Sequence, residues 1–249
     1  MAIAAPLLTP YSPIRTVGKP LQPPSPKHPF GTNRLGYDMW SRTVYGARTI
    51  LSVVFLAIFI SMVVGVPLGL LSGYYGGLLD RILSMIMDAI YAFPSLVLAI
   101  ALAVALGPSI FNAAIAIAVV YVPTYFRMIR GQVLSIKESA FIEAARALGL
   151  PATRILFHHI MPHTIPSMMV VFSLSAADAV LTEAALSFLG LSIQPPTPDW
   201  GYDLSQGRAF MLSGYWWLVF FPGLMITLLA TGFALIGEGL SEHVRREGL

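Results

Sequence analysis

The chain has 249 residues, of which 56% are hydrophobic and 11% charged, and its mean hydropathy is +0.75. A soluble domain of this length would need many more charged side chains at its surface, so the composition excludes an ordinary soluble protein and indicates a polytopic, all-α membrane protein. The net charge of +3 is small, and the basic residues stand in loops rather than in a patch interleaved with aromatic residues, which argues against nucleic-acid binding.

The first part of the chain precedes any complete apolar block. Residues 1–8 are apolar, but they span only about two helical turns and cannot cross a hydrocarbon core about 30 Å thick. They lack the basic region of a signal peptide, so we interpret them as the end of a longer element. Residues 9–46 are rich in proline and polar residues, which predicts an irregular extracytoplasmic segment. Asp38 precedes the run MWSRTVYGARTIL, whose third residue is Ser41, and we expect this run to lead into the membrane as a helix.

Five apolar blocks follow, each close to the roughly 20 residues that a membrane-spanning helix needs. We expect residues 47–240 to form the transmembrane domain, with a cytoplasmic loop at about 130–163, an outer loop at about 191–214 and a cytoplasmic tail at 241–249. The blocks lie at residues 50–71, 82–106, 110–129, 165–189 and 216–236.

Lysine and arginine near the membrane ends of the blocks decide the orientation. The loop between the third and fourth blocks has the densest positive charge near helix ends, so we place it in the cytoplasm. Over the whole chain this orientation puts eight basic residues inside and seven outside, so the total count decides little. The basic residues of that loop are Arg127, Arg130, Lys137, Arg146 and Arg154.

The stretch at residues 143–162, EAARALGLPATRILFHHIMP, is a long, charge-bearing interruption between apolar blocks. Alanine and leucine predict a short helix, and Gly149 can end it in the left-handed conformation without a Cβ clash. Pro151 is expected to prevent that helix from resuming. Because its side chains are mostly alanine, the helix offers a narrow surface that fits a groove on another protein.

Three carboxylates lie in or near the predicted spans. A carboxylate that faced lipid would cost at least a few kcal/mol, so each should face the bundle interior, a partner subunit or water. Two interpretations stay open: the carboxylates line a polar translocation path, or they are capped or paired structural groups close to the interface. The candidate path residues are Asp88, Asp178 and Glu183, together with Pro94.

Proline and glycine inside the apolar blocks also need a reason. Pro67, Pro94 and Pro123 each remove a backbone hydrogen bond and should bend their helices, either at a gate or as plain structural bends. Gly65 and Gly69 form a G-x-x-x-G spacing that permits close approach of a second helix.

The sequence contains no motif for enzymatic chemistry. It has no G-x-x-x-x-G-K-[ST] phosphate loop, no H-E-x-x-H zinc helix and no G-x-S-x-G turn, so neither ATP hydrolysis nor proteolysis is assigned to it. The absence of cysteine excludes disulfides and cysteine-based metal chemistry. Two of His158, His159 and His163 could share a helical face as metal ligands, but no nearby carboxylate completes a site, and we favour a role at the membrane interface.

Four blocks of the sequence occur in an order typical of one family. They read HPFGTNRLGYDMWSRTVYGART, AFPSLVLAI, EAARALG followed by HIMP, and EAALSFLGLSIQPPTPDWG. The third block resembles the EAA loop of binding-protein-dependent ABC importer permeases. Together the blocks cover nearly the whole chain and resemble the dipeptide, oligopeptide and nickel permease family, in particular its C-type subunit.

The resemblance implies a type I ABC importer permease fold in a bacterial-type plasma (inner) membrane, with five full spans in this chain. In such importers the EAA helix docks in a cleft of a separate ATPase subunit and couples ATP-driven closure to movement of the membrane helices. The expected partners are a homologous second permease, two ATP-binding subunits that hold ATP and Mg, and an extracytoplasmic solute-binding protein; no cofactor is expected on this chain. The implied ATPase-coupling residues are Glu143, Ala144, Ala145, Gly149, Ile160 and Pro162.

The outer loop combines rigid prolines with a tryptophan near the membrane interface. A binding surface for a soluble partner and simple aromatic anchoring are both open from the residues alone. The resemblance implies that this loop faces the solute-binding protein. The residues concerned are Pro195, Pro196, Trp200 and Gly201.

Three features depart from the family pattern. Met161 replaces the usual leucine before the proline, a volume-conserving change that should be mild. Asn33 and Tyr37 replace the aspartate and arginine of the GTD-x-x-GRD block, so a charge-pairing role of that block is not carried over. The first span is represented only by its end, and we expect either a start further upstream or a five-span variant.

The function implied by the resemblance is ATP-driven uptake of peptides or related small solutes, with nickel complexes and glutathione within the family's range. An ATP-independent secondary transporter or channel is the alternative. That alternative explains the apolar blocks and the buried acids, but it leaves the EAA helix without a purpose.

Overall fold

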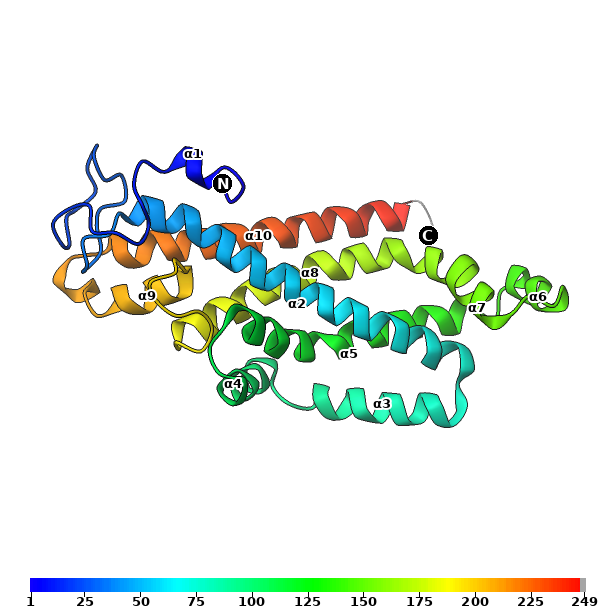
Figure 1. Ribbon diagram of the computed structural model, residues 1–249. Helices are drawn as coiled ribbons and strands as arrows, with labels where there is room; N and C mark the ends of the chain where they lie inside the picture. The colour runs from blue at the N-terminus through cyan, green and yellow to red at the C-terminus, as the bar shows by residue number, and fades with distance from the viewer. Residues whose placement is uncertain (247–249) are drawn as a thin grey trace. The chain divides into compact units, whose positions relative to one another are not determined.

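The computed structural model describes residues 1–246, and regular structure in this part of the chain is helical apart from one isolated bridge between Thr32 and Asp38. The longest helices are α2 (Met39–Tyr75), α5 (Ile110–Ile136), α8 (Met161–Phe188) and α10 (Trp217–Arg246), and they can be followed in Figure 1. The shorter elements are α1 (Ala5–Leu8), α3 (Gly77–Tyr91), α4 (Ser95–Leu106), α6 (Ala140–Ala147), α7 (Ala152–Arg154), the π-helix η1 (Ile155–Ile160), α9 (Trp200–Arg208) and the 3-10 helix η2 (Met211–Ser213). The predicted all-α fold class is confirmed.

Among the described residues, four helices are long and apolar enough to cross a membrane. They cover Met39–Tyr75, Ile110–Ile136, Ala152–Phe188 and Trp217–Val244. Helices α3 and α4 form a bent pair that would count as a fifth span. The predicted tail at 241–249 continues α10 as far as Arg246, and beyond that residue it lies outside the described part of the chain.

The second predicted block, residues 82–106, is not one straight helix. Helix α3 ends at Tyr91, α4 begins at Ser95, and the two helices are bent by 90°. Pro94 lies in the break, where it lacks the N–H that a continuing helix needs and disfavours helical geometry at Phe93. The expected bend is therefore a complete interruption, whereas α2 and α5 continue through Pro67 and Pro123.

The fourth predicted block begins earlier than expected. Helical structure resumes at Ala152, directly after Pro151, and continues through α7 and η1 into α8. Helix α6 itself does not resume, as expected, but Pro151 is the N-cap of a new helix, so it separates two helices and does not begin a longer loop. Proline is tolerated there because the N–H that it lacks would have no intrahelical partner at a helix N-terminus.

Contacts divide the chain into two compact units, of which unit 1 comprises Met1–Ala57, Ala99–Ile117 and Ala177–Gly232. Its apolar centre includes Met39, Trp217 and Leu218. The Trp217 ring N–H donates to the carbonyl oxygen of Thr32 (3.4 Å), and Phe30 stacks on Phe221 with ring centroids 3.7 Å apart. The N-terminal segment is thus packed against the start of α10.

The proline-rich segment before α2 is irregular, as predicted, but it has a defined internal structure. The Nδ1 atom of His28 lies 2.8 Å from Oδ1 of Asp38, and both side chains are buried. The other carboxylate oxygen of Asp38 accepts from the backbone N–H and the hydroxyl of Ser41 (2.8 and 2.7 Å). Asp38 therefore caps the N-terminus of α2, which confirms the predicted helix start.

Unit 2 comprises Ile58–Leu98, Ala118–Ala176 and Phe233–Leu249. In it, α2 and α5 approach closely along three glycines spaced four residues apart. A Cβ atom added to Gly65, Gly69 or Gly73 would lie 2.8, 2.7 and 2.7 Å from the nearest atoms of α5. The G-x-x-x-G packing role is therefore confirmed, and Gly73 extends it by one further turn.

Replacing Gly69 with alanine should destabilise the protein by about 1–3 kcal/mol, because the new methyl group would meet the Phe126 carbonyl oxygen at 2.7 Å and force α2 and α5 apart. Gly131→Ala is the matched control, since Gly131 also lies in a helix but has no atom within 4 Å of the position that a methyl group would occupy. Thermal unfolding of both purified variants in detergent measures the effect. Equal apparent Tm values for the two variants would contradict the close approach.

Candidate functional site

Helix α6 carries the first half of the predicted docking stretch. Ile142 and Ala145 are three residues apart and share the face that packs into unit 2, where both are buried. Glu143 and Ala144 lie on the exposed face. Glu143 is in the first turn and Arg146 in the last, so both charges are favourably placed with respect to the helix dipole. The predicted coupling residues are therefore divided: Glu143 and Ala144 are accessible, while Ala145 anchors the helix.

The end of α6 is a Schellman motif. The Leu150 N–H donates to the Ala145 carbonyl oxygen (3.2 Å), and the Gly149 N–H donates to that of Arg146 (2.9 Å). Gly149 has φ +73° and no atom within 4 Å of the position a Cβ would occupy. The glycine is thus required by backbone conformation and not by lack of space, which confirms the predicted left-handed helix end.

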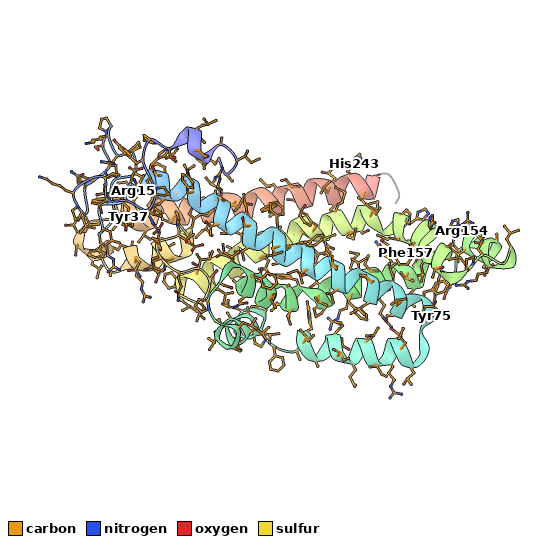
Figure 2. The ribbon with its side chains drawn as sticks, in the orientation of Figure 1. Arg15, Tyr37, Tyr75, Arg154, Phe157 and His243 are labelled. Carbon is orange, nitrogen blue, oxygen red and sulfur yellow. The ribbon has the colours of Figure 1, made fainter. Side chains whose placement is uncertain are left out.

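The far end of the predicted stretch lies inside a continuous helical run. Ile160 is buried at the last position of η1, and Pro162 is exposed near the start of α8. The Met161 N–H donates to the Leu156 carbonyl oxygen, which is the wider hydrogen bond of a π-helix. Pro162 cannot donate to the carbonyl four residues before it, so its position favours this local departure from α geometry. Figure 2 shows Arg154 and Phe157 in this segment, just after α6.

Three basic side chains from α5, α6 and the turn between them contact residues 72–80. This segment comprises the end of α2, Gly76 and the start of α3, and we call it the α2–α3 turn. The contacts are Arg130 Nε and Nη2 to the Asp80 carboxylate (2.5 and 2.7 Å), Lys137 Nζ to the Gly73 carbonyl oxygen (2.9 Å), and the Arg146 guanidinium over the Tyr74 ring (5.4 Å). Ser72 also donates to Asp80. The basic residues that sequence reasoning used only for orientation therefore tie the docking helix to a neighbouring turn.

The outer loop has one exposed part and one buried part. Pro195 and Pro196 are exposed, whereas Trp200 and Gly201 are buried. The Trp200 ring N–H donates to the Thr43 carbonyl oxygen (2.7 Å), and a Cβ on Gly201 would meet the backbone of α8 at 2.3 Å. Trp200 and Gly201 thus have a packing role that the sequence interpretation missed, and the face they were expected to present is not available in unit 1.

A buried ion pair joins the start of α2 to α9 within unit 1. On α2, Nε of Arg42 donates to both oxygens of Asp203 on α9 (2.9 and 3.0 Å), and Nη2 lies 2.8 Å from one of them. Nη1 donates to the carbonyl oxygens of Pro13 and Pro196 (3.0 and 3.2 Å). Burial raises the pKa of the Asp203 carboxyl, and Arg42 partly offsets that rise. The pair lines a pocket of about 80 Å³ together with Pro195, Pro196 and Tyr202.

The four candidate path residues have different surroundings. Asp88 is exposed and pairs with Arg127 at 2.6 Å, and Pro94 is exposed in the break between α3 and α4. Asp178 is exposed on α8. Glu183 is fully buried and accepts a hydrogen bond from Ser192 (3.1 Å). The contacts of Asp88 and Glu183 fit the alternative of a paired or capped structural carboxylate, and a path role stays a prediction for all four residues.

Comparison with known proteins places this geometry in a family. Residues 65–246, which include α6 and the outer loop, match the family described as "Binding-protein-dependent transport system inner membrane component". The dipeptide transport system permease protein DppC of Alkalihalophilus pseudofirmus is 47% identical over 97% of this chain and 80% of its own length. The chain belongs to this family of permeases.

Two other relatives are also permeases, and one solved structure has a similar fold. The glutathione transport system permease protein GsiD of Salmonella paratyphi A is 42% identical over 88% of this chain and 72% of its own length. The probable D,D-dipeptide transport system permease protein DdpC of Escherichia coli K12 is 39% identical over 89% and 74%. A chain of the MetNI methionine ABC transporter has a TM-score of 0.65 at 23% identity, covering 84% of this permease and 96% of that chain. The predicted ABC importer permease fold is thereby confirmed.

The family assignment settles two further expectations. The permease is an inner-membrane transport component, and it belongs to a family of transport subunits that lack an ATPase domain. No group of three or more histidine, cysteine or acidic side chains that could hold a metal ion occurs in the described residues. The ring of His163, one of the three histidines considered as metal ligands, packs against the ring of Phe141 with 5.4 Å between the centroids.

The departures at Asn33 and Tyr37 have local explanations. The Asn33 side-chain oxygen accepts from the backbone N–H groups of Leu35 and Tyr37 (both 2.9 Å), so the amide closes the turn as an aspartate would. Arg42 lies over the Tyr37 ring at 5.7 Å, and Figure 2 shows Tyr37 in the packed segment before α2. The turn at residues 33–37 is therefore closed by Asn33 without the aspartate and arginine of the GTD-x-x-GRD block.

Proposed function

We propose that this permease is one of two membrane-spanning subunits of an importer that takes up short peptides with ATP hydrolysed on separate subunits. The names of its relatives support the substrate class, since they refer to dipeptides, D,D-dipeptides and glutathione, which are all short peptides. The expected partners are a homologous permease, two ATP-binding subunits that hold ATP and Mg, and an extracytoplasmic solute-binding protein.

The observation that carries the coupling role is the exposed face of α6 with its fixed end. Leu148 is 81% exposed and Phe141 is 45% exposed, although both are large apolar side chains. They flank the small, exposed Ala144 on a helix whose end is fixed by Gly149. Apolar side chains around a small-residue surface are suited to burial in a groove on another protein. We assign that groove to the ATPase subunit.

The α2–α3 turn is the route by which displacement of α6 would reach the membrane helices. Arg146 lies in the last turn of α6, and its contact with Tyr74 connects that helix to the α2–α3 turn, while Arg130 and Lys137 connect the turn to α5 and the residue that follows it. Because these contacts lie within unit 2, movement of α6 would shift the ends of α2, α3 and α5 together. The exposed prolines of the outer loop, Pro195 and Pro196, remain our proposed contact with the solute-binding protein.

Cross-linking tests the docking directly, because the chain contains no cysteine and a single one can be introduced without interference. We expect Leu148→Cys, labelled with a photo-reactive maleimide in the assembled complex, to cross-link to the ATPase subunit. Leu212→Cys is the matched control, since Leu212 is fully exposed in η2 of the outer loop. Cross-linking of Leu212→Cys but not Leu148→Cys to the ATPase subunit would overturn the assignment.

A further inference from the structure

Two carboxyl groups meet in the interior of unit 1, outside the coupling site. Glu183 lies on α8, and Asp199, in the first half of the outer loop, is the N-cap of α9. Both residues have 0% of their surface exposed. Asp199 accepts a hydrogen bond from Ser187, which lies one turn after Glu183 on the same face of α8, so the two carboxyl groups are neighbours. Because two bare carboxylates repel strongly in such surroundings, their proximity requires an explanation.

The hydrogen bonds around the pair leave one oxygen of each group without a donor. Ser192 donates to Oε1 of Glu183 (3.1 Å). Ser187 and the backbone N–H of Tyr202 (2.9 Å) both donate to Oδ1 of Asp199. Oε2 of Glu183 and Oδ2 of Asp199 are buried and have no donor. A buried oxygen that stayed unsatisfied would destabilise the folded state.

The charged groups packed around the pair do not supply the missing donor. Asp203 on α9 adds a further carboxylate, and its interaction with Asp199 is repulsive. Arg42 of α2 donates its hydrogen bonds to Asp203 and to two backbone carbonyl oxygens. Arg208 on α9 is exposed and lies over the Phe188 ring. A proton is the smallest species that satisfies both orphaned oxygens at once.

We propose that Glu183 and Asp199 share one proton, held as a carboxylic acid that donates to a carboxylate, and that this proton fastens the first half of the outer loop to α8. The site is thus a buried proton-binding site. It differs from the Arg42–Asp203 pair, which is held by charge. Loss of the proton would leave two adjacent carboxylates and release the contact between the loop and the membrane helix.

The site makes stability depend on pH in a definite direction. Burial raises the pKa of the Asp199 carboxyl. The folded pair therefore binds more protons than the unfolded chain, so its contribution to stability is full at low pH and falls as pH rises through the raised pKa. In Glu183→Gln the amide N–H takes the place of the proton, and this part of the pH dependence should disappear.

Infrared difference spectroscopy on the purified permease complex in lipid tests the proposal. We expect the wild type at neutral pH to have a protonated-carboxyl C=O band that is lost in Glu183→Gln and retained in Asp178→Asn, which alters an exposed carboxyl on the same helix. Asp199→Asn provides a second variant, because its amide can donate to Glu183 while still capping α9. A wild type without the band, or with a band that survives both Glu183→Gln and Asp199→Asn, would overturn the proposal.

Thermal unfolding distinguishes a proton from a bound cation. We expect the apparent Tm of the wild type to fall with rising pH more steeply than that of Glu183→Gln, and to be unaffected by EDTA. Equal pH dependence in both proteins would contradict the shared proton. A Tm lowered by EDTA in the wild type alone would show that a divalent cation bridges the two carboxylates, and it would also overturn the proposal.

Discussion

Replacing Gly149 with valine should reduce ATP-dependent uptake about tenfold while the permease still assembles with its partners. A left-handed residue other than glycine costs roughly 1–2 kcal/mol, and a β-branched side chain is among the least tolerant. Because about 1.4 kcal/mol corresponds to a factor of ten, strain of this size is enough to favour a frayed end of α6 over the docked one. Uptake and ATP hydrolysis by reconstituted complexes measure the effect.

Asparagine at the same position is the matched control. Gly149→Asn adds a side chain of similar size to valine, but asparagine adopts the left-handed conformation more readily and occurs at helix ends of this kind. No neighbouring atom opposes either side chain at its Cβ position. We expect Gly149→Asn to keep most of the uptake. Equal activity of both variants would mean that the conformation of Gly149 does not matter for coupling.

Truncation of Asp203 to alanine should destabilise the permease by about 3–5 kcal/mol, because it leaves the Arg42 guanidinium buried without its charge partner. Asp88→Ala is the control. The pair of Asp88 with Arg127 has side chains 64% and 41% exposed, so its loss should cost only about 0–1 kcal/mol. Thermal unfolding of the purified proteins compares the two variants.

The double variant Arg42→Met/Asp203→Leu separates the cost of an orphaned charge from loss of the pair. Removing both charges leaves no buried ion, so we expect this variant to recover much of the stability lost in Asp203→Ala. If Asp203→Ala and Asp88→Ala had the same small effect, the Arg42–Asp203 pair would not stabilise unit 1.

Local sequence signals predicted the features that depend on neighbouring residues. Asp38 caps α2 by accepting from the N–H of Ser41, three residues later, and Gly149 ends α6. Both caps could be predicted because a helix cap depends on residues within one turn. The spacing of Gly65 and Gly69 likewise indicated close helix packing. Apolar block length located four of the spans.

The features that sequence reasoning missed depend on contacts between distant residues. Arg42 and Asp203 are 161 residues apart, and Trp200 donates to a carbonyl 157 residues away. From the sequence alone, Trp200 is expected at a binding surface or at the membrane interface. A tryptophan beside prolines in a polar loop has no local sign of burial. Glu183 and Asp199 lie in different predicted elements, so their contact could not be inferred from spacing.

Proline positions were only partly predictable for a different reason. Pro67 and Pro123 are accommodated inside long helices, Pro94 separates α3 from α4, and Pro151 begins a new helical run. The local chemistry is the same in each case, since every proline lacks an N–H donor. The packing around each helix decides whether it continues, ends or restarts.

Uptake of a labelled dipeptide into proteoliposomes that contain the assembled complex and excess solute-binding protein tests the central claim most directly. The structure and the proposed docking of α6 predict uptake only when ATP reaches the ATPase subunits, with uptake strongly reduced in Gly149→Val. Uptake that persists without ATP, at the same rate in both proteins, would contradict ATP-driven import and would favour a secondary transporter or channel.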